Sequence, residues 1–199
     1  MRVEDLGRWA PLSVAATVEV LSAVQFRWWF SGGLALELHV GRSWRAHDDT
    51  DVGVARRDAT ALLSVLEGWD IRVAAAGRLT PWTGEQLDAA LHRNNLWCRR
   101  STNGPWLLDV TISEGDDDTW VYRRDHRIRI PWADAVLGTP GGLPYLAPEL
   151  QLLFKSRDRR EKDEIDARQV APELDSVRAD LLRQMLPASH PWQRLLVPG

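Results

Sequence analysis

Two carboxylates stand two residues apart at the start of an apolar run, in the segment 47–54 (HDDTDVGV). Since side chains alternate along a β-strand, Asp49 and Asp51 would point to the same face. Two carboxylates held side by side repel each other unless a cation lies between them, and hard oxygen ligands suit Mg²⁺ or Mn²⁺. The motif therefore predicts a divalent-metal site. A solvated acidic turn capped by Asp48 or Asp49 is the alternative for this segment taken alone.

A third carboxylate, Asp109, lies inside the apolar segment 106–112 (WLLDVTI). Such a run is typical of a buried strand, and a buried carboxylate needs either a partner or a metal ion. Asp109 is therefore a further candidate ligand or base. The alternative is a position at a sheet edge, where one of the many arginines would pair with it.

A glycine turn, Ser31-Gly32-Gly33, separates a short aromatic segment from an apolar one. A turn between a strand and a helix presents backbone N–H groups to an anion, and the helix N-terminus favours negative charge. The turn is a candidate phosphate site, although two glycines alone are more often only a turn.

Positive charge is carried almost entirely by arginine, because the 25 basic residues include only two lysines, Lys155 and Lys162. Both fall in one stretch, 155–162 (KSRDRREK). With Arg42 and Arg45 they are candidates to face a triphosphate, whose charge requires nearby cations. Solvated helix residues with internal ion pairs, for example within 162–166 (KDEID), are the alternative.

The elements that must position these residues follow from hydrophobic periodicity and turn signals. We expect helices at 13–25, 34–39, 58–67, 148–157, 161–170 and 173–186, and strands at 27–30, 50–55, 70–74, 96–100, 106–113, 119–123 and 127–130. The segment 75–91 gives no firm assignment. The predicted fold is α+β, a small mixed sheet flanked by helices over residues 1–140, with a C-terminal helical segment over 141–199 packed on it.

Length and composition narrow the classes of function. A chain of 199 residues fits one domain. The single cysteine, Cys98, excludes a disulfide framework and a cysteine-built zinc site, and favours a reducing compartment. A net charge of −3 disfavours a broad nucleic-acid surface, and no apolar run approaches the ~20 residues that span a bilayer. A cytoplasmic protein is expected. The 11 tryptophans are expected mostly in the core, although Trp28, Trp29, Trp44 and Trp106 flank the predicted site.

Taken together, the order of these motifs resembles the nucleotidyltransferase superfamily with the DNA polymerase β-like fold. The sequence is most similar to aminoglycoside 2''-nucleotidyltransferase-like proteins. The likeness rests on 31–36 (SGGLAL), Gly41-Arg42 and 45–51 (RAHDDTD), covers residues 28–55, and extends to Asp109 and more weakly to 155–166. Thr50 stands where the family has a branched aliphatic residue, and it keeps the β-branch.

The resemblance implies transfer of a nucleoside monophosphate, with AMP from ATP expected, to a hydroxyl of a small-molecule acceptor such as an aminoglycoside. Asp49 and Asp51 would hold two Mg²⁺ or Mn²⁺ ions about 3.5–4 Å apart, and Asp109 would complete the coordination of the second ion or act as general base. Ser31, Gly32 and Gly33 would hold the β- and γ-phosphates, near Arg42, Arg45, Lys155 and Lys162. Neither a membrane nor a nucleic acid is an expected partner.

Two other functions compete with this one. The same fold could serve as a non-catalytic nucleotide-binding or antitoxin-like regulatory module, since fold does not fix function. Transfer to a protein or an RNA end is disfavoured by the small size and mild acidity. The acidic run Glu114 and 116–118 could attract a polycationic acceptor, with a solvated hairpin tip as the alternative. Arg123, Arg124, Arg127 and Arg129 are expected on the exposed face of a strand.

Overall fold

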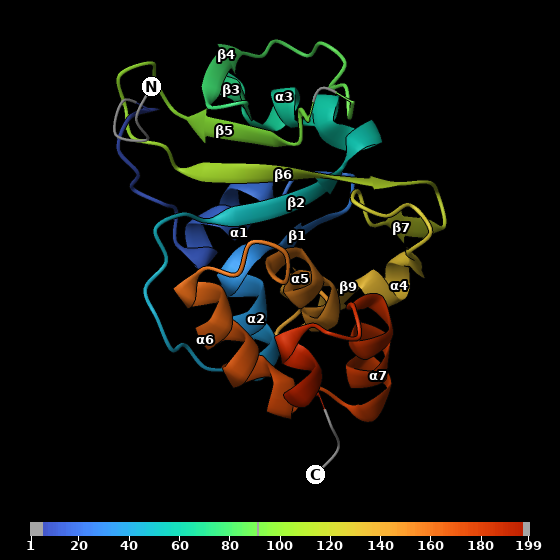
Figure 1. Cartoon of the computed structure of the whole chain (residues 1–199). Coiled ribbons are helices and arrows are strands. Elements are labelled where there is room, and N and C mark those ends of the chain that lie inside the picture. The colour runs from blue at the N-terminus through green and yellow to red at the C-terminus, as the bar shows by residue number, and fades with distance from the viewer. Residues whose placement is uncertain (1–5, 91, 197–199) are drawn as a thin grey trace.

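A mixed sheet runs through the computed structural model, which describes residues 6–90 and 92–196 (Figure 1). Within that part of the chain the strand order is β4-β3-β5-β6-β2-β1-β10-β9, and β7 and β8 extend from β6. The strands are β1 (Trp28–Phe30), β2 (Asp51–Ala55), β3 (Asp70–Ala75), β4 (Arg78–Pro81), β5 (Asn95–Arg99), β6 (Leu108–Gly115), β7 (Thr119–Val121), β8 (Arg129–Pro131), β9 (Val136–Gly138) and β10 (Pro144–Leu146).

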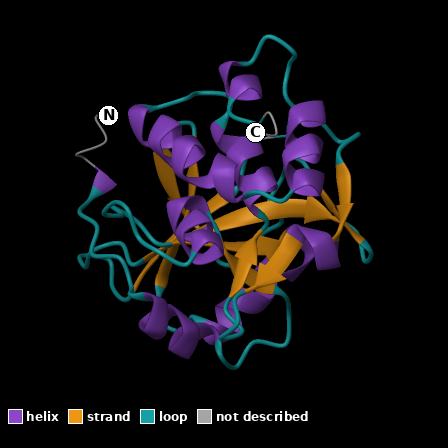
Figure 2. Cartoon of the chain, turned by 90° about the horizontal axis from the view of Figure 1, so that it is seen from below, coloured by secondary structure: helices purple, strands orange, loops and turns teal. Residues whose placement is uncertain are grey.

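Helices lie on opposite sides of the strands when the molecule is seen from below (Figure 2). They are α1 (Val14–Leu21), α2 (Gly32–Val40), α3 (Leu62–Val65), α4 (Trp132–Ala135), α5 (Pro148–Lys155), α6 (Glu161–Val170) and α7 (Ser176–Met185). Helices α2, α5, α6 and α7 gather together in the lower half of Figure 1. Helix α2 ends at Gly41, whose φ of 78° is a left-handed C-cap. No helix of the described residues is both long and apolar enough to cross a bilayer.

Alternation along the strands divides the core into two clusters. Trp29 and Phe30 are neighbours on β1, yet Trp29 packs with α5 and α7 residues such as Leu150 and Leu182, whereas Phe30 packs with Val54 of β2. Side chains two apart share a face. Asp51, Gly53 and Ala55, which alternate with the two valines of β2, therefore lie on the face toward the helices α2, α5 and α6.

The register of three strands brings the predicted site together. Strand β2 pairs in parallel with β6, with Asp51 opposite Asp109, and pairs antiparallel with β1, with Val52 opposite Phe30. Ser31 follows Phe30 directly, and its N–H donates to the carbonyl oxygen of Asp51 at 3.0 Å. The glycine turn therefore begins beside the two central carboxylates.

The predicted α+β class is confirmed, and the differences are local. The helix expected at 58–67 is a 3₁₀ turn (Arg56–Ala61) followed by the single α-turn α3. The segment 75–91, which had no assignment, contains β4. Strands β9 and β10 flank residue 140, and β10 joins β1, so the sheet continues into the segment expected to be helical. Three-residue strands of this kind carry too little alternation to be recognised in a sequence.

Candidate active site

A cavity of about 480 Å³ lies between the sheet and the helices α2, α5 and α6. Its walls include nearly every residue that the sequence singled out: Ser31, Gly32, Gly33, Arg45, Asp49, Asp51, Asp109, Lys155 and Lys162. Arg42 is the exception, because it does not line the cavity and its guanidinium carbon lies 5.6 Å from the ring centroid of Trp44. The structure thus brings residues of two strands (β2 and β6) and three helices (α2, α5 and α6), which lie far apart in the sequence, to one place.

The glycine turn closes tightly on its neighbours. Gly32 has a φ of 67°, and a Cβ there would overlap the Asp51 carboxylate. A Cβ on Gly33 would overlap the guanidinium of Arg45. The N–H of Gly32 donates to Oε1 of Gln151 at 2.9 Å, a contact from α5 that sequence reasoning missed. Only glycine fits at either position, so the turn places bare backbone against the carboxylates.

The central carboxylates are held on β2 and β6. Asp109 is 8% exposed and accepts hydrogen bonds from Asn95 Nδ2 at 2.8 Å and from Trp97 Nε1 at 3.0 Å. Burial raises the pKa of Asp109 to about 7, helped by the charge of Asp49 and opposed by these two hydrogen bonds. Burial also raises the pKa of Asp51 well above its usual range, and the charges of Asp109 and Asp49 raise it further.

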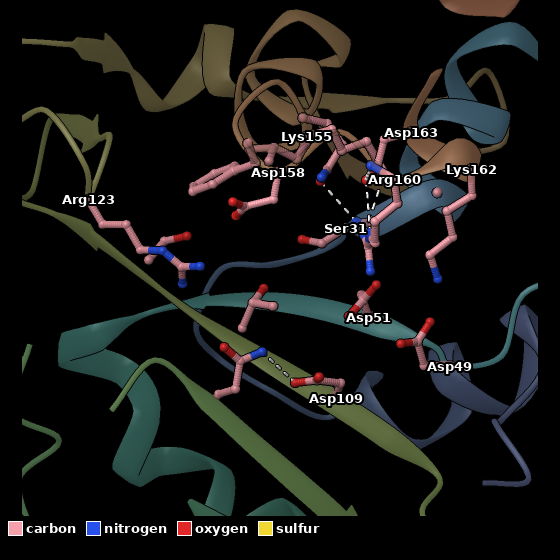
Figure 3. A pocket seen from close by; sticks show the side chains of 18 of the residues that line it. Ser31, Asp49, Asp51, Asp109, Arg123, Lys155, Asp158, Arg160, Lys162 and Asp163 are labelled. Atoms are coloured by element: carbon pink, nitrogen blue, oxygen red, sulfur yellow. Dashed lines mark hydrogen bonds and ion pairs between the residues drawn. The ribbon is translucent and has the colours of Figure 1, made fainter. Parts of the chain in front are cut away.

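These carboxylates have no cation of the protein bound to them. Among the described residues, neither Asp49 nor Asp51 nor Asp109 lies within 4.0 Å of a basic side chain, as an ion pair would require. Figure 3 shows the three side chains facing one cavity. Buried carboxylates with raised pKa values and oxygen-only donor chemistry fit a divalent cation.

The carboxylates do not form a complete metal cage by themselves. No group of three or more His, Cys, Asp or Glu side chains within 6–90 and 92–196 is close enough to hold a metal ion. Mg²⁺ commonly takes only one or two protein carboxylates and completes its shell with substrate phosphates and water. The donor set therefore fits an ion that arrives with a phosphorylated ligand.

A second pair of carboxylates, on α6, is neutralised by the protein itself. Lys155 Nζ lies 2.9 Å from Asp163 Oδ1 and 3.0 Å from Asp166 Oδ2. Arg45 donates to both oxygens of Asp166, and Trp44 Nε1 donates to Oδ1, each at 2.9 Å. Burial opposes ionisation, but these contacts lower the pKa of Asp166. Lys155 and Arg45 line the cavity as predicted, yet their charges are already balanced.

Lys162 is the freer of the two lysines. Its side chain is 34% exposed, and its Nζ is 3.9 Å from an oxygen of the exposed Asp48. Arg160, which the sequence analysis did not single out, also lines the cavity but donates to Asp163 at 2.9 Å. Lys162 is therefore the cation best placed to meet an incoming phosphate.

Several lining residues had no recognised signal in the sequence. Asn95, Gln151 and Phe154 line the cavity, as does Arg123, which was expected on an exposed strand face. Strand β7 ends at Val121 and β8 starts at Arg129, so Arg123 belongs to the turn between them. The tryptophans expected beside the site do not line the cavity in the described part of the chain. Trp29 and Trp106 are instead fully buried.

Comparisons with known proteins concern the family and the fold. Residues 13–80 match the family model described as aminoglycoside-2''-adenylyltransferase. The crystal structure of ANT(2'')-Ia in complex with adenylyl-2''-tobramycin is similar with a TM-score of 0.55 and 12% identity, covering 84% of this chain and 90% of that one. The lincomycin-bound structure of the lincosamide antibiotic adenylyltransferase LnuA is similar with a TM-score of 0.54 and 18% identity, covering 81% and 98%. No curated protein matches the chain.

Proposed function

We propose that this chain is a nucleotidyltransferase that transfers an adenylyl group from ATP to a hydroxyl of a small-molecule acceptor, with the help of Mg²⁺; its similarity to an adenylyltransferase family model and to two adenylyltransferase structures supports the proposal. The observation that carries the proposal is the set of three carboxylates that face one cavity beside a bare glycine turn and pair with no basic side chain of the described residues. One structural neighbour is in complex with adenylyl-2''-tobramycin, and the other is a lincosamide antibiotic adenylyltransferase with lincomycin bound, which makes hydroxylated antibiotics the first acceptors to examine.

In this proposal residues 1–140 supply the carboxylates and the glycine turn, and residues 141–199 supply the lysines. Asp49 and Asp51 would hold the metal, which supplies charge stabilisation at the phosphates when bound. The Ser31 hydroxyl and the N–H of Gly33 would bind the β- and γ-phosphates, together with Lys162, and the Gly32 N–H would join them on leaving Gln151. Lys155 and Arg45 would position this wall through Asp166 rather than bind the phosphates directly.

Asp109 is the proposed general base. The acceptor oxygen forms a bond to the α-phosphorus, the bond from that phosphorus to the bridging oxygen breaks, and pyrophosphate leaves with the electron pair. The proton of the acceptor hydroxyl passes to Asp109. A pKa of about 7 suits this role, since a base works best when its pKa lies near the operating pH.

The test is the release of pyrophosphate from ATP and Mg²⁺ in the presence of hydroxylated acceptors, including tobramycin and lincomycin. We expect Asp51→Asn and Asp109→Asn each to lower turnover by on the order of 10²–10⁴-fold. Asp180→Asn is the matched control, because Asp180 is exposed and pairs only with Arg183 on α7. Tight binding of ATP without turnover of any acceptor would instead favour the regulatory module.

A further inference from the structure

One end of the cavity carries positive charge that the protein leaves unbalanced. Arg123 is half-buried there, with its guanidinium carbon 5.2 Å from the ring centroid of Phe154. Arg124 lies beside it, 5.6 Å from the same ring, and donates to the carbonyl oxygen of Phe154 at 2.8 Å. Figure 3 shows Arg123 at the opposite end of the cavity from Lys162 and Asp49.

These two arginines differ from the other cations of the cavity. Arg45, Lys155 and Arg160 are each bound to a carboxylate of α6. Within the described residues, neither Arg123 nor Arg124 forms an ion pair. Burial lowers the pKa of Arg123, and the charge of Arg124 lowers it further. A half-buried charge of this kind is costly, so a ligand that brings negative charge would be bound favourably.

The acidic residues of the neighbouring hairpin do not neutralise the positive charge at this end of the cavity. Glu114 is bound by Arg56, Asp116 by Arg129 and Asp117 by Arg57, and none of these three acids lines the cavity. From the sequence, these acids belong to the run that could attract a polycation. The carboxylate that does reach this end, Asp158, is exposed and forms no ion pair within the part of the chain that is described.

Strand β6 links the proposed base to the two arginines. Asp109, Thr111 and Ser113 alternate along one face of it and all line the cavity. Four residues of strand span roughly 13 Å, and the Arg123 side chain extends from its turn into the cavity, which shortens the gap to Asp109 (Figure 3). A single acceptor can therefore place a hydroxyl at Asp109 and another group near Arg123.

We infer that the acceptor of this enzyme is a hydroxylated small molecule with an anionic group, a carboxylate or a phosphate, which Arg123 and Arg124 bind. The inference rests on the proposed function and specifies its substrate class. It distinguishes this chain from an enzyme for polycationic aminoglycosides, whose amino groups would meet the two guanidinium groups with like charge.

The test measures binding to the full chain in the presence of Mg²⁺ and a non-hydrolysable ATP analogue, by calorimetry. The probes are glucose, glucose 6-phosphate, gluconate, glucosamine and tobramycin, which vary charge and identify which anion is preferred. We expect at least one of the two anionic probes to bind at least tenfold more tightly than glucose and tobramycin. Arg123→Gln should abolish that advantage, and Arg123→Lys should restore part of it. Equal or tighter binding of tobramycin, or no preference for an anion, overturns the inference.

Two controls separate the inference from the proposed function. Arg127→Gln removes the same charge from the same turn, but Arg127 is 90% exposed and outside the cavity, so the anion preference should persist. Binding of the ATP analogue is measured for the same proteins and for Asp51→Asn, which shows whether this binding depends on Asp51. If that binding is absent, the proposed function fails. If it is present and Arg123→Gln weakens the analogue rather than the anionic probe, Arg123 serves the nucleotide and only the acceptor inference fails.

Discussion

Two pairs of carboxylates, one on α6 and one on the sheet, lie at or beside the cavity and differ in how the protein neutralises them. Asp163 and Asp166 on α6 are bound by Lys155, Arg45 and Arg160, and their pKa values are lowered. Asp51 and Asp109 on the sheet receive no cation from the described residues, and their pKa values are raised. Burial acts on both pairs alike, so the presence or absence of basic partners makes the difference.

The contrast distinguishes carboxylates that stabilise the fold from carboxylates that are available to bind a ligand. A neutralised pair holds α6 against α5 and against the segment that follows α2, and needs nothing further. An unneutralised pair destabilises the folded protein by itself and gains from a bound cation. The comparison therefore predicts that substitutions in the two pairs change stability in opposite directions.

The largest effect is expected at Asp166, which is fully buried. Asp166→Asn would leave Lys155 and Arg45 with one buried carboxylate fewer, so we expect a loss of about 3–5 kcal/mol in the free energy of unfolding. Urea denaturation of the metal-free protein measures it. Asp180→Asn, in an exposed i,i+3 pair, should change stability by less than about 0.5 kcal/mol. A loss at Asp166 no larger than this control would show that the α6 pair is not structural.

The glycine turn connects the two pairs, since Gly32 touches Asp51 and Gly33 touches Arg45. Gly32→Ala combines a left-handed φ with a steric overlap, and we expect a loss of about 1–3 kcal/mol together with weaker binding of Mg²⁺ and ATP. Gly33→Ala should lower stability by a similar amount through Arg45. Gly138→Ala is the matched control, because a Cβ there meets no atom within 4 Å. Thermal unfolding and nucleotide titration distinguish the three variants. Equal stability and equal nucleotide binding of all three would contradict the steric requirement for glycine at positions 32 and 33.

Asp51→Asn should stabilise the metal-free protein at pH 8, by about 1–2 kcal/mol. A carboxyl group whose pKa is raised by folding binds its proton more tightly in the folded state. Its stability penalty is absent below the unfolded value near 3.9 and grows as the pH rises toward the folded value. The wild-type protein should lose stability from pH 5 to pH 8 in EDTA, and Asp51→Asn should lose less.

Urea denaturation at both pH values measures this difference. The Asn variant should also lose the stabilisation that Mg²⁺ and an ATP analogue give the wild type. A variant that is less stable than wild type at pH 8 in EDTA would contradict the idea that the sheet pair is held against its own repulsion.

The sequence was sufficient where local periodicity decides the outcome. Alternation predicts that Asp49 and Asp51 share a face, whereas the order of motifs in a known family was needed to join Asp109 and the glycine turn to them. The charge balance was not predictable, because it depends on long-range contacts. Lys155 and Asp166 are on different helices, and Arg45 reaches Asp166 across 121 positions of sequence. Lys155 and Arg45 were therefore expected as free cations.

Arg123 is the opposite case, because it was expected on the surface and instead lines the cavity. Its alternation with apolar neighbours indicated an exposed strand face, but the strand ends two residues earlier and the turn folds over the cavity. Whether a turn residue points into a cavity depends on the elements that close around it, here Phe154 of α5. Arg42 was expected near the triphosphate from its place in a motif, and its stacking on Trp44 could not be deduced from that.

The smallest predicted effects come from two tryptophans that play matched parts. Trp44 Nε1 donates to Asp166, and Trp97 Nε1 donates to Asp109. Trp44→Phe removes one of several donors to a well-neutralised carboxylate, so we expect a loss of about 1 kcal/mol in stability and no shift in the pH profile of activity.

Trp97→Phe leaves Asp109 with Asn95 as its donor, which disfavours the charged form and raises the pKa of Asp109 above about 7. Activity of Trp97→Phe should then be reduced near pH 7 and recover toward that of the wild type near pH 9. The pH dependence of kcat/KM for both variants measures this, and a parallel loss at every pH would mean that the indole of Trp97 only packs against Trp9 and Trp106.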